Sequence, residues 1–353
     1  MKHWSTIAPL LAAALLGAAA VFPLNGALAL LDGIALVGAV LAAVHHAEVV
    51  AHKLGEPLGT LVLALAVTVI ETSLIVSLML AGGPETAVLA RDTVYAAVMI
   101  IANGVIGLGI LVGGLRHREQ SFRVEGAGPA FAALVTLASL ALVLPGFTTS
   151  VPGPGSTTIQ LDFAGLESLV LWGIFVFVQT VRHRDYFLSP DPESDEHLPP
   201  PSALTAWLSV GLLLVALVGV VGLAKVLSPT IEAAVRAAGF PDSVVGIAIA
   251  MVVLLPETVA AVRAAWANKL QTSMNLALGS ALATIGLTIP AVVVVSQLFH
   301  LPLVLGLQGK EMILLGITFV VGGITLGPGR TNIMQGAVHL VLFAAFLFLS
   351  FVP

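Results

Sequence analysis

The sequence of 353 residues contains no cysteine and very few charged residues. Without cysteine, disulfide bonds and thiolate-bound metals are excluded. Charged residues make up 9% of the chain and hydrophobic residues 58%, whereas a soluble domain carries about 25% charged residues. The net charge of −5 gives no basic surface for nucleic acid, so no nucleic-acid partner is expected. The composition excludes an ordinary soluble domain and predicts a protein whose partner is the lipid bilayer.

Long apolar runs, separated by glycine, proline and charge, are each long enough to cross a bilayer. A spanning helix needs about 20 mostly apolar residues, and no run shows the alternation of a membrane barrel. We therefore expect an all-α, polytopic membrane protein with about eleven transmembrane helices. The expected ranges are 6–24, 27–50, 57–81, 93–115, 128–145, 163–182, 202–227, 242–264, 272–297, 302–323 and 331–352.

The first range has an alternative interpretation as a signal peptide, because Lys2 precedes its apolar run and Ala-Leu-Ala follows it. The apolar sequence resumes directly after Asn25 and Gly26, which favours a first helix that turns into a second.

The longest hydrophilic stretch, 183–201, divides the chain into two halves and is rich in acids and prolines. It is either a solvated linker or a loop that attracts cations. We expect a first transmembrane helix at 1–26, an N-terminal five-helix repeat at 27–182, an acidic cytoplasmic linker at 183–201 and a C-terminal inverted five-helix repeat at 202–353.

The basic residues of the loops predict the orientation of the chain. With the N-terminus in the cytoplasm and the C-terminus outside, ten basic residues face the cytoplasm: Lys2, Lys53, Arg116, Arg118, Arg123, Arg182, Arg184, Arg263, Lys269 and Arg330. Three face outside: Arg91, Lys225 and Arg236. The expected location is the bacterial inner (cell) membrane.

The two halves repeat a pattern of acids and glycines. The series are Glu48, Gly55, Gly59 and Glu71 in the first half, and Glu232, Gly239, Gly246 and Glu257 in the second. Five helices per unit is an odd number, so the two units must insert with opposite orientations. Inverted repeats with a site at the membrane midplane are typical of secondary transporters.

Glu71 and Glu257 are the acids expected near the middle of the membrane. Glu71 lies about fourteen residues, or roughly 20 Å, into its predicted helix, and Glu257 lies at a similar depth. A carboxylate there is costly unless it is paired, protonated or in contact with water. The carboxyl oxygens can hold either protons or a hard cation, and this competition is the basis of antiport. The alternative is a protonated glutamate that only makes hydrogen bonds between helices.

Other polar groups could complete or serve such a site. Pro256 removes a helix donor and should free a carbonyl oxygen beside Glu257. The candidate supporting side chains, each of which could instead bridge helices, are Thr68, Thr72, Ser73, Asn103 and Ser280.

The acids that precede the two midmembrane glutamates have two interpretations. Glu48 and Glu232 are either outer stations on the ion path or solvated helix ends. His45, His46 and His52 surround Glu48. They could relay protons or sense pH, because histidine titrates near neutrality, or they could be solvated at the membrane interface. His52 could also act at an entrance. These histidines are the only feature of the sequence that would support a membrane-embedded enzyme. No nucleophile or complete metal triad accompanies them. We therefore expect no enzyme. His339 is expected to pack in the last helix.

Several motifs resemble the calcium/cation antiporter superfamily, and most closely the bacterial ChaA branch of its CAX-type cation/proton exchangers. They are HAEVVAHKLGEPLG at 46–59, GGLRHREQ at 113–120, LPET at 255–258, LQTSMNLALGS at 270–280 and GRTNIMQG at 329–336. The resemblance implies eleven helices, inverted repeats, exchange at Glu71 and Glu257, and gating acids at Glu48 and Glu232. It also implies that Ser280 and Asn103 match family positions.

The chain departs from the CAX pattern in its neutral ligands. Thr68 and Leu254 stand where the family carries asparagines, Thr258 where it carries a histidine and Ala283 where it carries a glutamine. The site therefore offers fewer side-chain oxygens than a typical calcium exchanger. We expect a Ca²⁺/H⁺ antiporter for which Na⁺ or K⁺ remain open, without a cofactor and with a homo-oligomer possible. The alternative is a passive cation channel built on the same carboxylates.

Overall fold

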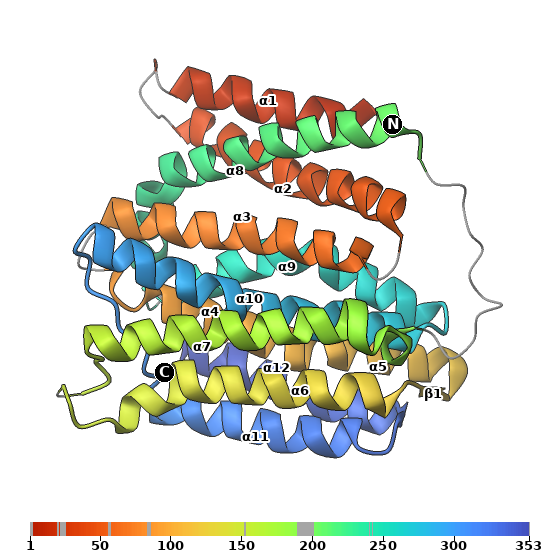
Figure 1. Cartoon of the computed structure of the whole chain (residues 1–353). Helices are drawn as coiled ribbons and strands as arrows, with labels where there is room; N and C mark the ends of the chain where they lie inside the picture. The colour runs from red at the N-terminus through yellow and green to blue at the C-terminus, as the bar shows by residue number, and fades with distance from the viewer. Residues whose placement is uncertain are drawn as a thin grey trace.

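The computed structural model describes residues 3–19, 21, 26–55, 58–82, 86–151, 153–188, 201–239, 241 and 243–352. Nearly all of this part is helical (Figure 1). The α-helices are α1 (His3–Ala19), α2 (Gly26–Leu54), α3 (Leu58–Gly82), α4 (Leu89–Met99), α5 (Ile106–His117), α6 (Val124–Ala138), α7 (Thr158–Phe177), α8 (Ala203–Ala237), α9 (Ser243–Trp266), α10 (Leu270–Leu298), α11 (Gly309–Leu326) and α12 (Ile333–Phe351).

Shorter turns extend or join these helices. Three π-helical turns continue α4, α6 and α7 and are η2 (Ile100–Val105), η3 (Ser139–Val143) and η5 (Val178–Arg182). Two 3₁₀ turns, η4 (Leu144–Phe147) and η6 (Arg184–Phe187), follow η3 and η5. Each of the eleven predicted ranges overlaps one of the resulting rods.

The length and surface of the helices identify a multi-pass membrane protein. Within the described residues, eight helices are long and apolar enough to span a bilayer, or nine if the bent pair Val244–Leu255 and Glu257–Trp266 forms one span. Their outer faces carry large exposed apolar side chains, such as Ile159 (80% exposed) and Val341 (68%), which lipid can solvate. The expected helical membrane fold is confirmed, whereas eleven crossings remain a prediction.

The predicted helix at 302–323 begins too early. The structure starts α11 at Gly309, because the preceding apolar residues form an extended segment that is buried. Val304 donates its backbone N–H to the carbonyl oxygen of Ala87 at 2.9 Å, and Leu307 donates to that of Leu142 at 2.8 Å. The apolar run therefore reflects burial between other elements, with its backbone satisfied outside any helix.

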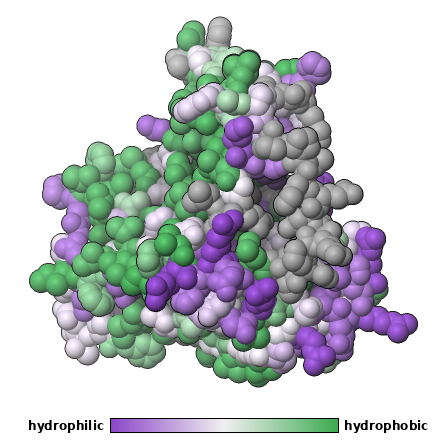
Figure 2. Space-filling view, turned by 45° about the vertical axis from the view of Figure 1, so that its right-hand side comes forward, coloured by the Kyte–Doolittle hydropathy of each residue, from purple (hydrophilic) through white to green (hydrophobic). Residues whose placement is uncertain are grey.

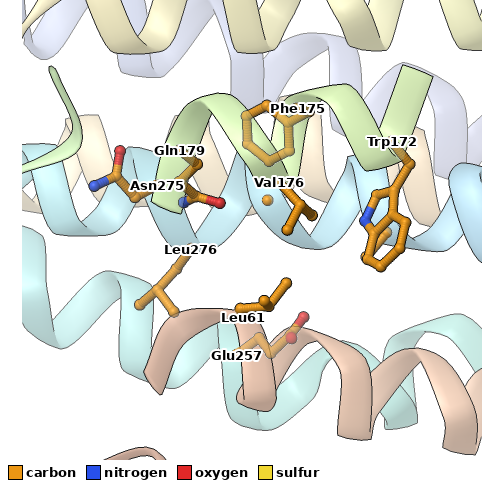
Figure 3. Close-up of a pocket in the computed structure, with 10 residues that line it drawn as sticks. Leu61, Trp172, Phe175, Val176, Gln179, Glu257, Asn275 and Leu276 are labelled. Atoms are coloured by element: carbon orange, nitrogen blue, oxygen red, sulfur yellow. The ribbon is translucent and has the colours of Figure 1, made fainter. Parts of the chain in front are cut away.

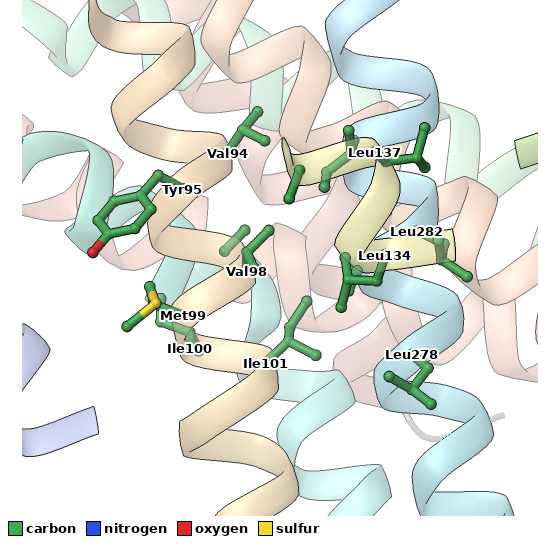
Figure 4. Packing of buried hydrophobic residues seen from close by; sticks show 14 of the residues in the cluster. Val94, Tyr95, Val98, Met99, Ile100, Ile101, Leu134, Leu137, Leu278 and Leu282 are labelled. Atoms are coloured by element: carbon green, nitrogen blue, oxygen red, sulfur yellow. The ribbon is translucent and has the colours of Figure 1, made fainter. Parts of the chain in front are cut away.

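Two hydrophobic cores organise the bundle. A smaller core joins α1, α2 and α8, which lie together at the top of Figure 1, to the facing sides of α3 and α9. A larger core unites α4 to α7 with α9 to α12. Figure 4 shows part of it, where Val94 of α4 lies near Leu137 of α6, and Val98 of α4 lies near Leu134 of α6.

The packing between the two halves is reciprocal. Helix α3 packs on α10, and α9 packs on α4 and α5. In the same way, α7 packs on α10 and α12 packs on α5. Helices α2 and α8, the first of each predicted repeat, pack directly on each other.

One end of the bundle, here named the β-ladder end, carries a two-stranded sheet that the sequence did not predict. Strands β1 (Glu119–Ser121) and β2 (Arg330–Asn332) are antiparallel, with Gln120 opposite Thr331. The GGLRHREQ and GRTNIMQG motifs thus lie side by side. Hydrophilic side chains gather at this end, whereas apolar ones cover much of the flanks (Figure 2). Figure 1 places the start of α1 at this end and the end of α12 at the other.

Side chains attach the sheet to the loop between α9 and α10. Gln120 donates from Nε2 to the carbonyl oxygen of Ala265 at 2.8 Å and to Oδ1 of Asn268 at 3.0 Å. The backbone N–H of Arg123 donates to Oε1 of Gln271 at 2.6 Å. Loops from both halves of the chain are therefore held together at this end.

Candidate cation site

Glu71 and Glu257 lie near the middle of α3 and α9 and are both buried. Glu71 is 0% exposed and Glu257 is 6% exposed. Both carboxyl groups face α10, where the residues that bond them are four positions apart. The structure therefore brings together the two acids that the sequence placed at matching positions of its halves.

Helix α10 supplies a hydroxyl donor to each carboxylate. Ser280 donates from Oγ to Oε2 of Glu257 at 2.5 Å, and Thr284 donates from Oγ1 to Oε2 of Glu71 at 2.7 Å. The two donors are four residues apart, so they lie on one face of the helix. Because both bonds come from α10, this helix fixes the positions of the two carboxyl groups relative to each other.

One carboxyl oxygen in this site is left without a partner. Oε1 of Glu71 is buried and accepts no hydrogen bond from any described residue. Buried polar atoms are almost always bonded, so this oxygen marks a place where a proton, a water molecule or a cation would bind.

Helix α9 is bent at the site. Its two segments, Val244–Leu255 and Glu257–Trp266, meet at an angle of 50°. Pro256 stands at the junction, and proline is a usual cause of such a bend because it breaks the helical hydrogen-bond ladder. The side chain of Pro256 lies outside the described residues, so its predicted role beside the cation stays a prediction.

The other predicted ligands have different surroundings. Thr68 is buried one turn before Glu71, and the hydroxyl of Thr72 bonds that of Thr288 at 2.9 Å. Asn103 lies in η2 and donates from Nδ2 to Oγ1 of Thr318 at 2.9 Å. Ser280, also a predicted supporting side chain, bonds a carboxylate directly.

His339 is buried in the last helix, as predicted, and it also makes hydrogen bonds. It is 2% exposed, and both of its ring nitrogens are hydrogen-bonded. Nδ1 lies 3.1 Å from Oδ1 of Asn103, and Nε2 lies 3.0 Å from Oγ1 of Thr325. Asn103 and His339 therefore belong to one polar network between η2, α11 and α12.

Two of the predicted gate residues, Glu48 and His52, lie in the last turns of α2. The side chain of Glu48 is 48% exposed, and its Oε2 lies 4.0 Å from Nδ1 of His45. His46 is buried and its Nε2 bonds the carbonyl oxygen of Ser5 at 2.8 Å, whereas His52 is exposed. The side chain of Glu232 and most of the acidic linker, 189–200, lie outside the described residues.

A metalloenzyme centre does not form within the described part of the chain. No group of three or more His, Asp or Glu side chains there comes close enough to hold a metal ion. A cation at Glu71 and Glu257 would therefore need further oxygen ligands from hydroxyl groups, backbone carbonyls or water.

Thr284 is a functional residue that the sequence did not predict. The residue sits in an apolar run, where a threonine usually serves packing or a bond between helices. The signal in the sequence is that Thr284 follows Ser280, a predicted supporting ligand, by four residues. Two hydroxyls at that spacing on one helix can face two separate carboxylates.

A narrow pocket reaches Glu257 from the β-ladder end. Figure 3 shows Glu257 facing Gln179 and Trp172 of the α7 and η5 rod across it. The full lining is Leu61, Trp172, Phe175, Val176, Gln179, Glu257, Asn275, Leu276, Gly279 and Ala283. Glu71 is not among the residues that line it, so Glu257 is the one of the two carboxylates that borders this pocket.

Comparisons with known proteins agree with this fold and site. The sequence model of the family described as sodium/calcium exchanger protein matches residues 9–181 and 208–352. The putative ionic transporter y4hA of Sinorhizobium fredii is 50% identical, with 99% of this chain and 96% of that protein covered. The sodium-potassium/proton antiporter ChaA of Escherichia coli is 34% identical at the same coverage.

Solved structures share the fold. The H⁺/Ca²⁺ exchanger CAX superimposes with a TM-score of 0.71 at 15% identity, with 98% of this chain and 88% of that chain covered. YfkE superimposes with a TM-score of 0.74 at 19% identity, with 99% and 100% covered. The chain therefore belongs to the sodium/calcium exchanger protein family, as a CAX-type cation exchanger related to ChaA.

Proposed function

We propose that the chain is a secondary active antiporter that exports a cation in exchange for protons, with Glu71 and Glu257 as the shared binding groups. The observation that carries this proposal is the pair of buried carboxylates held by one helix, with Oε1 of Glu71 unpartnered. A buried acid in a membrane protein is a functional site by default.

The site favours exchange because the two ligands compete for the same oxygens. A cation requires ionised carboxylates, whereas protons neutralise them and weaken cation binding. Ser280 and Thr284 can donate a hydrogen bond to the ionised form or accept one from the protonated form. Neither state therefore leaves the carboxyl groups without a partner.

The cation is proposed to be Ca²⁺, with Na⁺ and K⁺ as further candidates. Two carboxylates balance the charge of one divalent ion, and hard oxygen ligands suit calcium. Among the relatives, CAX is named for H⁺ and Ca²⁺, whereas ChaA is named for sodium, potassium and protons. Thr68, Thr72, Asn103 and the backbone near Pro256 remain proposed supporting ligands.

Alternating access would use the inverted five-helix repeats at 27–182 and 202–353. The reciprocal packing of α3 on α10 and of α9 on α4 and α5 supports this symmetry. Two structurally equivalent halves can exchange conformations, which opens the central site to one face and then to the other. Glu48 and Glu232, with His52, are proposed to gate that access.

The β-ladder end is proposed to face the cytoplasm of a bacterial cell. Loops at this end carry most of the basic residues, including Arg116, Arg123 and Arg330, which is the usual cytoplasmic bias. The N-terminus would then be cytoplasmic and the C-terminus outside. A homo-oligomer remains a prediction.

The test is proton exchange in everted membrane vesicles loaded with a pH-sensitive dye. Addition of Ca²⁺, Na⁺, K⁺ or Mn²⁺ to the wild-type protein should release protons for at least one ion. Glu71→Gln and Glu257→Gln should abolish that release, whereas Glu125→Gln, at an exposed position in α6, should not. Wild-type exchange by both carboxylate variants would refute the proposal.

The same vesicles distinguish an antiporter from a passive channel. An antiporter moves the cation against its gradient when a proton gradient is imposed. Cation flux that follows only its own gradient, with no proton movement, would establish the channel alternative.

A further inference from the structure

Gln179 occupies a position that the proposed exchange chemistry has not used. It belongs to η5, the π-helical turn that continues α7 at the β-ladder end. The residue is 5% exposed and lines the pocket that leads to Glu257 (Figure 3). Short π-helical turns are frequent at functional sites, so the contacts of this side chain matter.

The amide of Gln179 has no hydrogen-bond partner among the described residues, although it is more than nine-tenths buried. The nearest walls of the pocket are apolar and include Trp172, Phe175 and Leu61. The amide atoms keep access to the space of the pocket, where a polar group can bind them. The groups that can reach it through the pocket are water and the ion that travels to Glu257.

The second amide of the pocket, Asn275, is already engaged. Its Nδ2 donates to the carbonyl oxygen of Phe187 at 2.5 Å, and its Oδ1 accepts from Nε2 of Gln271 at 2.9 Å. These bonds fix Asn275 in the wall of the pocket. Gln179 is therefore the side chain whose amide oxygen is available to a passing ion.

The small size of the pocket suggests what the amide oxygen of Gln179 does. The pocket offers about 20 Å³ to the centres of water molecules, which is room for about one water molecule. A hydrated cation cannot pass without losing most of its water. Hard cations accept amide carbonyl oxygens in place of water, and Gln179 is the amide that can supply one before the ion reaches Glu257.

We propose that Gln179 is a cation-coordinating residue on the route to Glu257, where its amide oxygen replaces a hydration water of the entering ion. The inference rests on the proposed function, because Glu257 must receive the ion that Gln179 passes on. It adds an uncharged ligand upstream of the carboxylates, for the same class of hard cation.

The experiment compares Gln179→Met with Gln179→Glu. Methionine keeps the length of the side chain and removes the oxygen, whereas glutamate keeps the shape and adds a charge. Initial exchange rates are measured against cation concentration in everted vesicles, which expose the proposed cytoplasmic face, and in right-side-out vesicles. Gln308→Met, at an exposed position beside the start of α11, is the matched control.

We expect Gln179→Met to raise the apparent KM about tenfold in everted vesicles and to change it less than threefold in right-side-out vesicles. Gln179→Glu should lower the apparent KM for a divalent ion in everted vesicles. Opposite shifts from two variants of similar size cannot arise from a merely structural role.

Two outcomes would overturn the inference. One is an unchanged apparent KM in both variants, and the other is a fall in maximal rate alone in both. If Gln179→Met does not fold, the direction of the Gln179→Glu shift still decides. Glu257→Gln in the same vesicles separates the two proposals, since normal exchange by that variant refutes the proposed function itself.

Discussion

The hydroxyl of Thr284 is the donor that holds Glu71, and Thr284→Val removes it while nearly keeping the shape of the side chain. Thr284 is 1% exposed, and its Oγ1 lies 2.7 Å from Oε2 of the carboxylate. The variant should therefore change the chemistry of the site with little change in its packing.

The expected effect is a loss of cation affinity. A hydrogen bond to a charged group contributes about 1.5–3 kcal/mol, which corresponds to about 10- to 150-fold in affinity. The bond is stronger when Glu71 is ionised, as cation binding requires, than when it is protonated. Its removal therefore favours the proton in the competition, and the loss should be larger at acidic than at alkaline pH.

The assay is the initial rate of exchange against cation concentration, at several pH values, in vesicles that contain equal amounts of protein. Thr288→Val is the matched control, because Thr288 lies one turn further along α10 and bonds the hydroxyl of Thr72 instead of a carboxylate. Its apparent affinity should stay within about threefold of wild type, because the bond it loses is between neutral groups.

Two results would refute this reasoning. If Thr284→Val keeps its affinity within threefold at every pH, the hydroxyl does not hold an ionised Glu71. If Thr288→Val loses as much affinity as Thr284→Val, the effect comes from the packing of α10 and not from the carboxylate.

Two further predictions concern stability, measured as the thermal unfolding temperature of detergent-solubilised protein. Gly336→Ala should destabilise the protein by about 1–3 kcal/mol, because a Cβ there would lie 2.6 Å from the backbone nitrogen of Leu111. The control Gly316→Ala, with open space around the residue, should be neutral or stabilising. Equal effects of the two variants would contradict the close approach of α12 to α5. Asp32→Leu should raise the unfolding temperature, since Asp32 is 0% exposed and both carboxyl oxygens lack a partner among the described residues. The control Asp162→Asn, at an exposed position, should change the unfolding temperature little. A lower unfolding temperature for Asp32→Leu would indicate a partner for that acid.

The helices could be predicted from the sequence because a bilayer imposes a length and an apolar composition on each of them. The start of α11 could not, because residues 301–307 are apolar for a different reason. They fill a buried space beside Ala87 and Leu142 in an extended conformation. Composition reports burial, and it does not distinguish a buried loop from a buried helix.

The site was predictable where charge made it conspicuous. Glu71 and Glu257 stood out because a carboxylate is costly within a membrane-spanning apolar run and usually marks a functional site. Thr284 and Gln179 are neutral, and such residues commonly serve packing in membrane helices. Their roles depend on which helix faces them, which only the three-dimensional arrangement reveals.

The networks beside the site show the same limit. Asn103 and His339 were interpreted separately, and the structure joins them at 3.1 Å although they are far apart in the chain. The burial of Asp32 was not predicted, because it arises where α2 packs between α1 and α8. Contacts between distant segments of the chain decide these roles.

The antiparallel pairing of β1 with β2 also has a consequence for biogenesis. Gln120 pairs with Thr331, a residue that the ribosome adds about 210 positions later. If translation proceeds at about 5–20 residues per second, roughly 10–40 s pass between the synthesis of β1 and that of its partner strand β2. Until then its backbone donors and acceptors are open to chaperones, proteases and other nascent chains. Pairing of this sheet is thus a late step of biogenesis, because it requires β2, the element directly before the last helix, to be synthesised.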